Sequence, residues 1–320
     1  MDGMSEPYTI LHGGFHKTAS TYLQRILHRN QGFLDKRGVH YVHHRTMRKQ
    51  FTVPCQENSY LHLNIKRNDV IEDAELRKLT SAFFKPIKER NPSRLILSDE
   101  NLAGHCGHCA KRGTLYRFRD AFMSVTAREI PFPVREVHLA VRNYADFYAA
   151  AYVEYIRSLR AISPTVIFPN VMVDRVMNNL LGWNGVIARV EHYFPEAQIY
   201  VWKFEDFRND PNMTGQILRN LVGDDIDISK FKTPKDPKKR PSASNRAMME
   251  IQKLILSEGI PGAVEKIRSI QERFPRSREN AGFDPWTEWE RKHLTNLYEG
   301  DIQRLEKSPS VRLVKSQPLF

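Results

Sequence analysis

The sequence has few cysteines, no long hydrophobic run and no recognisable export signal. Three cysteines in 320 residues are a small and odd number, which argues against a disulfide framework and indicates a reducing compartment. Residues 1–7 lack the basic and apolar regions of a signal peptide, and no apolar run approaches the ~18 residues that a membrane span requires. These absences predict a cytoplasmic protein without a transmembrane segment, and they leave contact with a membrane surface open.

Acidic residues are also scarce relative to basic ones. Lysine and arginine number 49, aspartate and glutamate 37, so the net charge is +12. Such an excess suits polyanionic ligands, which include nucleic acid, an acidic glycan, anionic lipid headgroups and a multiply phosphorylated cofactor. The charge alone selects none of these ligands, and a non-catalytic polyanion-binding module is one interpretation of it.

Strand and helix patterns alternate along the chain, which is typical of an α/β protein with a mostly parallel sheet. The expected strands are residues 8–11, 38–42, 94–98, 136–141 and 198–202. No internal repeat or linker divides the chain. We therefore predict one domain over residues 1–320, with about five parallel strands flanked by helices and a helical C-terminal part.

Several segments show the apolar spacing of amphipathic helices. The expected helices include residues 58–90, 115–128 and 144–160, and Met248, Ile251 and Ile255 mark another. Asp284-Pro285 resembles an N-cap followed by proline at the first helical position. The residues expected in the core around this last helix are Trp286, Trp289, Leu294, Tyr298, Ile302 and Leu305.

The segment between the first strand and the first helix has the layout of a phosphate-binding loop. Backbone N–H groups of a glycine-bearing turn and the positive end of a helix attract an anion, a lysine adds charge, and hydroxyls donate hydrogen bonds. An ordinary helix start needs a single capping hydroxyl, whereas this turn carries three. The candidate phosphate-binding residues are Gly14, His16, Lys17, Thr18, Ala19, Ser20 and Thr21.

This loop does not fit the nucleoside-triphosphate pattern G-x-x-x-x-G-K-[ST], because His16 precedes Lys17 and Leu11 lies six residues before it. It resembles the loop of sulfotransferases that use 3′-phosphoadenosine 5′-phosphosulfate (PAPS), roughly K-[ST]-G-[ST]-T, often preceded by Gly-x-His. Ala19 stands where that family usually has glycine, a mild departure if the residue is helical.

The resemblance implies transfer of a sulfuryl group from PAPS to a hydroxyl or amine of an acceptor, without a metal. The acceptor would be a small molecule or a glycan, such as a carbohydrate or glycolipid, and not a nucleic acid. In this reading Lys17 neutralises the charge that grows on the leaving 5′-phosphate oxygen.

Acidic residues follow the third expected strand, whose carboxyl end should lie beside the loop at one edge of the sheet. Ser98-Asp-Glu-Asn-Leu102 is similar to the S-x-E segment of glycan-type and bacterial sulfotransferases, so Glu100 is the expected catalytic base. A base near neutral pH would need a pKa raised by partial burial. Asp99 and His16 are the alternatives.

The same segment also allows an alternative interpretation of the protein's function. Apolar residues 95–97 followed by Asp99 and Glu100 also resemble a strand that holds magnesium in a kinase or NTPase. The absence of Gly-Lys in the loop counts against that reading.

Arg142, at the end of the fourth expected strand, matches an arginine that grips the 3′-phosphate of PAPS in the resembling family. The serine that usually shares this grip, eight residues later, is Ala150 here, and Tyr148 or Tyr152 is a candidate replacement. Residues 230–244 hold six basic residues and three prolines, which predicts an extended basic loop. By resemblance, Lys239 and Arg240 in that loop would close over the nucleotide.

The run His105-Cys-Gly-His-Cys109 invites a zinc hypothesis. Structural zinc sites draw ligands from two separated clusters, and Cys55 is the only other cysteine. We therefore expect a loop near the acceptor pocket and no metal.

Overall fold

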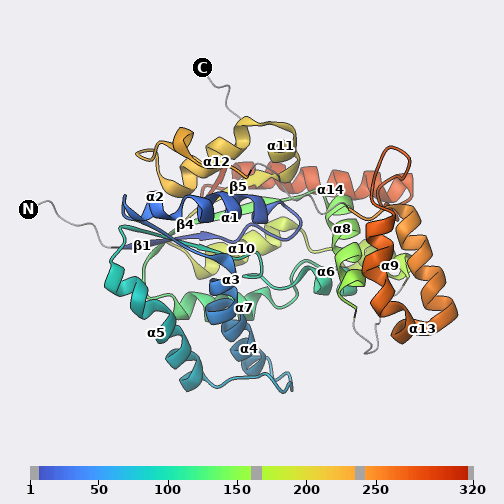
Figure 1. The fold of residues 1–320 in the computed structure, drawn as a ribbon, viewed down its shortest axis with the longest axis horizontal. Coiled ribbons are helices and arrows are strands. Elements are labelled where there is room, and N and C mark those ends of the chain that lie inside the picture. The colour runs from blue at the N-terminus through green and yellow to red at the C-terminus, as the bar shows by residue number, and fades with distance from the viewer. Residues whose placement is uncertain (1–6, 160–167, 235–241, 316–320) are drawn as a thin grey trace, which may run out of the picture.

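A single parallel sheet organises the chain in the computed structural model, which describes residues 7–159, 168–234 and 242–315 (Figure 1). Its six strands lie in the order β2-β3-β1-β4-β5-β6, and every pair is parallel. The strands are β1 Tyr8–His12, β2 Val39–Val42, β3 Arg94–Ser98, β4 Val134–Val141, β5 Gln198–Lys203 and β6 Val311–Leu313. The predicted α/β class and the five predicted strands are confirmed. The sixth strand, three residues at the sheet edge, was not predicted.

Helices connect the strands and cover both faces of the sheet. Those preceding β4 are α1 Ser20–Arg29, α2 Gln31–Asp35, α3 His44–Met47, α4 Val53–His62, α5 Asp73–Arg90, α6 Cys106–Arg112 and α7 Arg119–Glu129. Those following it are α8 Tyr144–Arg157, α9 Pro169–Asn179, α10 Trp183–Tyr193, α11 Phe204–Asn209, α12 Asn212–Val222, α13 Asn245–Arg273 and α14 Glu288–Lys307. A π-helical turn spans Arg48–Thr52 and a 3₁₀ turn Ile228–Lys230.

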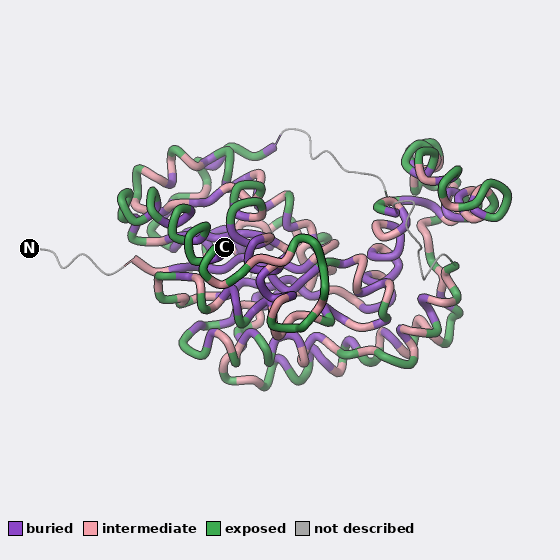
Figure 2. Tube along the Cα trace, turned by 90° about the horizontal axis from the view of Figure 1, so that it is seen from below, coloured by how far each residue is buried: buried purple, intermediate pink, exposed green. Residues whose placement is uncertain are grey.

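The core has two parts because successive strand residues point to opposite faces of the sheet. Ile10 and Ile96 pack with α1 and α12 on one face, whereas Leu11 and Leu97 pack on the other with α7 and α10. In Figure 2 the buried residues, in purple, gather in the interior, and the exposed residues, in green, lie toward the outside. Burial on both faces explains the apolar runs at the centres of β1 and β3.

Three predictions about the helices need correction. The segment 58–90 contains the end of α4 and the whole of α5, with a break between them. Helix α14 begins at Glu288, because Thr287 and Glu290 form a capping box there. Asp284-Pro285 is therefore not its N-terminus. Trp289, expected in the core, is 67% exposed, whereas Trp286, Leu294, Tyr298, Ile302 and Leu305 are buried as expected.

Candidate functional site

The loop after β1 is closed by its own hydroxyls. Thr18 donates a hydrogen bond to the carbonyl of Phe15, and Ser20 donates one to the carbonyl of Gly14. Both hydroxyl residues are buried, whereas Thr21 is exposed on α1. Thr18 and Ser20 thus fix the shape of the loop. Two of its backbone N–H groups are also engaged, that of Gly14 with the His138 carbonyl and that of His16 with the Tyr116 hydroxyl.

Two loop residues adopt left-handed backbone conformations. Lys17 has φ 65° and Ala19, the N-cap of α1, has φ 63°. Ala19 is thus not helical, and alanine in place of glycine is more than a mild departure, because the left-handed region is unfavourable for residues with a Cβ. Gly14 is required for a different reason: a Cβ there would lie 2.8 Å from His12 Nε2 and 2.9 Å from Ser20 Oγ.

Lys17 is held by a carboxylate that the sequence did not indicate. Its Nζ lies 2.7 Å from Oε2 of Glu154, on α8, and Arg157 Nη1 lies 3.3 Å from the same oxygen. The Lys17 and Glu154 side chains are 26% and 30% exposed, so solvent and ligands can reach the pair. The Glu154 carboxylate thus takes the position beside the Lys17 ammonium group that an anionic ligand would take.

Arg142 lies at the carboxyl end of β4 and points at the same loop. Its Nη1 donates a hydrogen bond of 2.8 Å to the carbonyl of Lys17, and its guanidinium lies 4.8 Å from the ring centroid of Phe204. Burial lowers the pKa of Arg142, and Arg208 and Arg276 act in the same direction, whereas Asp146 and Glu205 raise it. The predicted meeting of loop and arginine at one sheet edge is confirmed, and Arg208 and Arg276 add positive charge nearby.

The sequence also suggested Tyr148 or Tyr152, and Lys239 and Arg240, as ligands of the 3′-phosphate side of the nucleotide. Tyr148 and Tyr152 are fully buried, and the ring of Tyr152 stacks on that of Phe283, with 5.4 Å between centroids. Burial counts against both as replacements for the serine missing at position 150. Lys239 and Arg240 lie outside the described residues.

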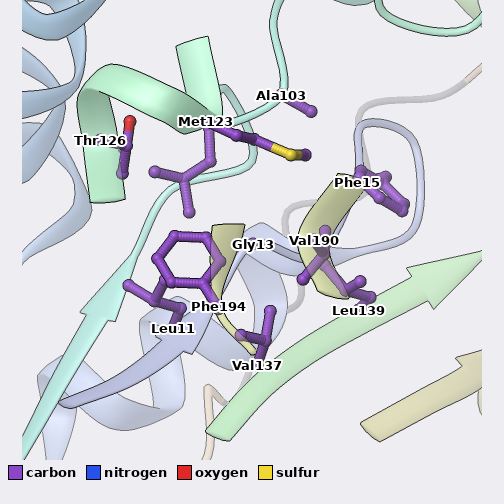
Figure 3. A pocket seen from close by; sticks show the side chains of 11 residues that line it. Leu11, Gly13, Phe15, Ala103, Met123, Thr126, Val137, Leu139, Val190 and Phe194 are labelled. Atoms are coloured by element: carbon purple, nitrogen blue, oxygen red, sulfur yellow. The ribbon is translucent and has the colours of Figure 1, made fainter. Parts of the chain in front are cut away.

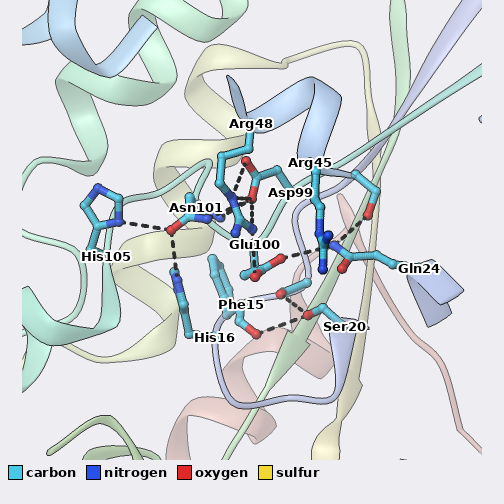
Figure 4. A network of polar contacts seen from close by, with 12 residues as sticks. Phe15, His16, Ser20, Gln24, Arg45, Arg48, Asp99, Glu100, Asn101 and His105 are labelled. Atoms are coloured by element: carbon cyan, nitrogen blue, oxygen red, sulfur yellow. Dashed lines mark hydrogen bonds and ion pairs between the residues drawn. The ribbon is translucent and has the colours of Figure 1, made fainter. Parts of the chain in front are cut away.

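The acidic turn after β3 is organised by Arg48, from the π-helical turn (Figure 4). Arg48 Nη2 lies 2.6 Å from Asp99 Oδ1 and 2.8 Å from Glu100 Oε1. Asp99 is completely buried and also accepts hydrogen bonds from the backbone and side chain of Asn101. Gln24 joins the turn to α1, donating to Glu100 Oε2 at 3.1 Å. Glu100 is therefore linked to α1, the helix that follows the loop, whereas Asp99 is engaged by Arg48 and Asn101.

The pKa of Glu100 is not raised, as a base acting near neutral pH would need. Burial, the largest influence, raises it, but Arg48, His16 and the hydrogen bonds from its own backbone and Gln24 outweigh burial and lower the pKa to about 2. The carboxylate is thus ionised at neutral pH. It can accept a hydrogen bond but is a weak base while Arg48 is bound to it.

His16 lies in the same polar network. Its Nε2 is 3.1 Å from Asn101 Oδ1, and its Nδ1 is 3.3 Å from the hydroxyl of Tyr116. Because the amide nitrogen of Asn101 donates to Asp99, its oxygen accepts from His16, which assigns the proton to Nε2. Burial lowers the pKa of His16 to about 4, so the ring is neutral at pH 7 and both nitrogens are engaged.

The run at 105–109, expected as a loop, forms the N-cap and first turn of helix α6, with His105 exposed. Cys106 and Cys109 are buried, and burial raises the pKa of Cys106 to about 11. The Tyr116 backbone N–H donates to Cys109 Sγ at 3.3 Å, while His105 Nδ1 lies 3.0 Å from Asn101 Oδ1. No group of three or more metal-ligating side chains occurs in the parts of the chain that the structure describes.

A small apolar cavity lies under the loop, between β1, β4, α7 and α10 (Figure 3). Its volume is about 20 Å³, and its lining includes Gly13, Phe15, Met123, Leu139 and Phe194. It has room for about one water molecule and offers almost no polar partner, so it is a packing defect and not a ligand site.

Sequence reasoning missed several residues of this site: Gln24, Arg48, Asn101, Tyr116 and Glu154. Gln24 could have been found, since it lies one helical turn after Ser20. No local pattern marks Arg48 or Glu154, whose partners are 51 and 137 residues away.

No protein-family model, curated protein or solved structure matches the chain. Among residues 7–159, 168–234 and 242–315, no helix has both the length and the apolar character needed to cross a membrane.

Proposed function

We propose that this protein transfers a sulfuryl group from PAPS to an acceptor hydroxyl or amine. The observation that carries the proposal is the contact between Arg142, at the end of β4, and the short loop that carries Lys17, with Arg142 Nη1 2.8 Å from the Lys17 carbonyl oxygen. Lysine and arginine at a loop that opens a helix suit a ligand with two separated anionic groups. The nucleotide donor has this character, with a 5′-phosphosulfate and a 3′-phosphate.

Lys17 and the loop N–H groups would hold the 5′-phosphosulfate. The 3′-phosphate would lie toward Arg142, with Arg208 and Arg276 adding charge. For this to happen Lys17 must leave Glu154, its partner at 2.7 Å. The donor's negative charge compensates for the loss of that ion pair.

The acceptor would approach from the side of Glu100. In the reaction the acceptor oxygen forms a bond to sulfur while the bond between sulfur and the bridging phosphate oxygen breaks. The acceptor proton moves to the Glu100 carboxylate, and adenosine 3′,5′-bisphosphate leaves with its new charge facing Lys17. Since the pKa of Glu100 is lowered to about 2 by groups that include Arg48, separation from Arg48 would make it a stronger base.

The kinase or NTPase alternative would use Asp99 to hold magnesium. Asp99 is fully buried and engaged by Arg48 and Asn101, which favours a structural role for it. The polyanion-binding alternative is not supported by this site. A module that only binds polyanions has no use for the carboxylate of Glu100, which is linked to α1 beside the loop.

Calorimetric titration tests the proposal directly. Adenosine 3′,5′-bisphosphate should bind wild-type protein more tightly than AMP, and ADP with magnesium should bind more weakly than either. Arg142→Gln should reduce the preference for the 3′-phosphate, and the exposed control Arg77→Gln should not. Binding of ATP with magnesium but not of PAPS or its product would overturn the assignment in favour of a kinase.

A further inference from the structure

A second basic site lies away from the loop. A cleft of about 520 Å³ opens between helix α9 and the segment joining α6 to α7, where α6 and α9 pack together (Figure 1). It is lined by Arg112, Thr114, Arg117, Arg175, Asn179 and Leu181. Its volume falls within the range of small-molecule sites.

No acidic side chain of the described residues forms an ion pair with Arg112, Arg117 or Arg175 in this cleft. Three guanidinium groups line it, and none of the lining residues is acidic. The nearest acidic side chains along the chain have other partners, since Asp120 lies 3.3 Å from Arg189 and Asp174 accepts from the Asn178 amide at 3.2 Å. Within the described residues no ion pair includes Arg112 or Arg117. Like charges held together in this way attract an anion.

Contacts between α9 and the segment that follows α6 hold the cleft in shape. Arg175 Nη1 donates to the Lys111 carbonyl at 2.6 Å. Gly113, with φ 71°, permits the close approach of the two segments, because a Cβ there would lie 2.2 Å from the Arg175 carbonyl oxygen. The buried hydroxyl of Thr114 has no hydrogen-bond partner among the described residues. A buried hydroxyl without a partner is costly, and a bound anion would satisfy it.

We propose that this cleft binds a ligand carrying sulfate or phosphate groups. Arginine forks match the oxygens of such groups, Thr114 supplies a further donor, and Leu181, 48% exposed, offers contact to an uncharged part of the ligand. The site is separate from the donor loop. The buried Tyr116 lies between the two sites. Its hydroxyl accepts a hydrogen bond of 3.1 Å from the His16 backbone N–H, and Arg117, the next residue, lines the cleft. The proposal stands independently of the enzymatic function.

The test uses full-length protein carrying Lys17→Ala, so that Lys17 does not contribute to binding. Sodium pyrophosphate and a trisulfated disaccharide are titrated by calorimetry at low ionic strength. Arg112→Gln/Arg117→Gln should weaken binding of the preferred probe at least tenfold. The control Arg77→Gln/Arg268→Gln also removes two positive charges, from exposed positions on α5 and α13, and should leave the affinity unchanged. Tighter binding of the disaccharide would identify an ester-linked anion, and tighter binding of pyrophosphate a free one.

A second measurement needs no substitution. In wild-type protein, pyrophosphate should slow phenylglyoxal modification of Arg112, Arg117 and Arg175, detected by mass spectrometry, but not that of Arg77. Equal affinities of the two double variants, no binding of either probe, or unprotected cleft arginines would overturn the proposal. Because Lys17 is absent from the titrated protein, failure here is distinguishable from failure of the loop to bind PAPS.

Discussion

Lys17 and Glu154 form an ion pair of 2.7 Å across 137 residues of sequence. The lysine comes from the loop after β1 and the carboxylate from α8, the helix that also carries Ala150. Glu154 therefore neutralises the charge that the loop would otherwise present to an anion. A ligand that uses Lys17 must first compete with this carboxylate.

Removing the competing charge should tighten binding of adenosine 3′,5′-bisphosphate. Both side chains are partly exposed, so the pair is worth about 0.2–1 kcal/mol, and Glu154→Gln should lower the Kd by roughly 1.4- to 5-fold. The exposed control Glu265→Gln on α13 makes the same change in net charge. Calorimetry that finds weaker binding in Glu154→Gln would instead give Glu154 a role in shaping the loop.

Glu100→Gln should lose most of the sulfuryl-transfer activity while binding of adenosine 3′,5′-bisphosphate is retained. In the proposed reaction Glu100 acts on the acceptor, and removal of a general base typically costs ~10²–10⁴-fold in rate. Glutamine keeps the size of the side chain and a hydrogen bond to Gln24 or Arg48. Release of adenosine 3′,5′-bisphosphate from PAPS, followed by chromatography, measures the rate. Near-normal turnover would transfer the role to His16 or Asp99.

The fold should lose stability in mild acid through His16. Its folded pKa is lowered to about 4 by burial, so the unfolded chain binds more protons than the folded one between about pH 6.5 and 4. The neutral ring therefore contributes stability above about pH 6.5 that is lost as the pH falls toward 4. Urea unfolding at pH 7.5, 6 and 5 should show a smaller loss in His16→Gln than in wild type. Parallel curves would contradict the role of His16.

Ala19→Gly tests the left-handed backbone at the start of α1. Glycine removes about 1–2 kcal/mol of conformational strain at φ 63°, but it costs about 0.4–1 kcal/mol through the greater freedom of the unfolded chain. A net gain in the free energy of unfolding is expected. The control Ala82→Gly, at an exposed site inside α5, should lose about 0.8–1 kcal/mol. Destabilisation of similar size in both variants would show that Ala19 is not strained.

Burial and strand direction made much of this molecule predictable. Residues such as Ile10, Leu11 and Leu97 are buried between layers of helices, so their strands stand out as apolar runs. Parallel strands place their carboxyl ends at one edge, which brings Lys17 and Arg142 together without any knowledge of their contacts.

Predictions failed where a residue's pKa depended on a partner distant in sequence, or where its burial depended on the residue at which a helix begins. The pKa of Glu100 is set in part by Arg48, from a π-helical turn with no clear sequence signature. Trp289 was assigned to the core because it follows Trp286 at helical spacing. The capping box at Thr287 begins the helix between the two tryptophans, which turns Trp289 to solvent.

The last prediction concerns Ala150, where the resembling family has a serine. If Arg142 holds the 3′-phosphate without that hydroxyl, Ala150→Ser should tighten binding of adenosine 3′,5′-bisphosphate by about 0.5–1.5 kcal/mol, the net worth of one hydrogen bond. Binding of AMP, which lacks the 3′-phosphate, should not change, so AMP is the internal control. An equal gain for both nucleotides would place the new hydroxyl elsewhere in the site. Equal affinities of the two nucleotides for wild-type protein would defeat the PAPS assignment. The loop would then serve a donor without a 3′-phosphate, such as adenosine 5′-phosphosulfate, and Lys17 would keep its role as a phosphate ligand.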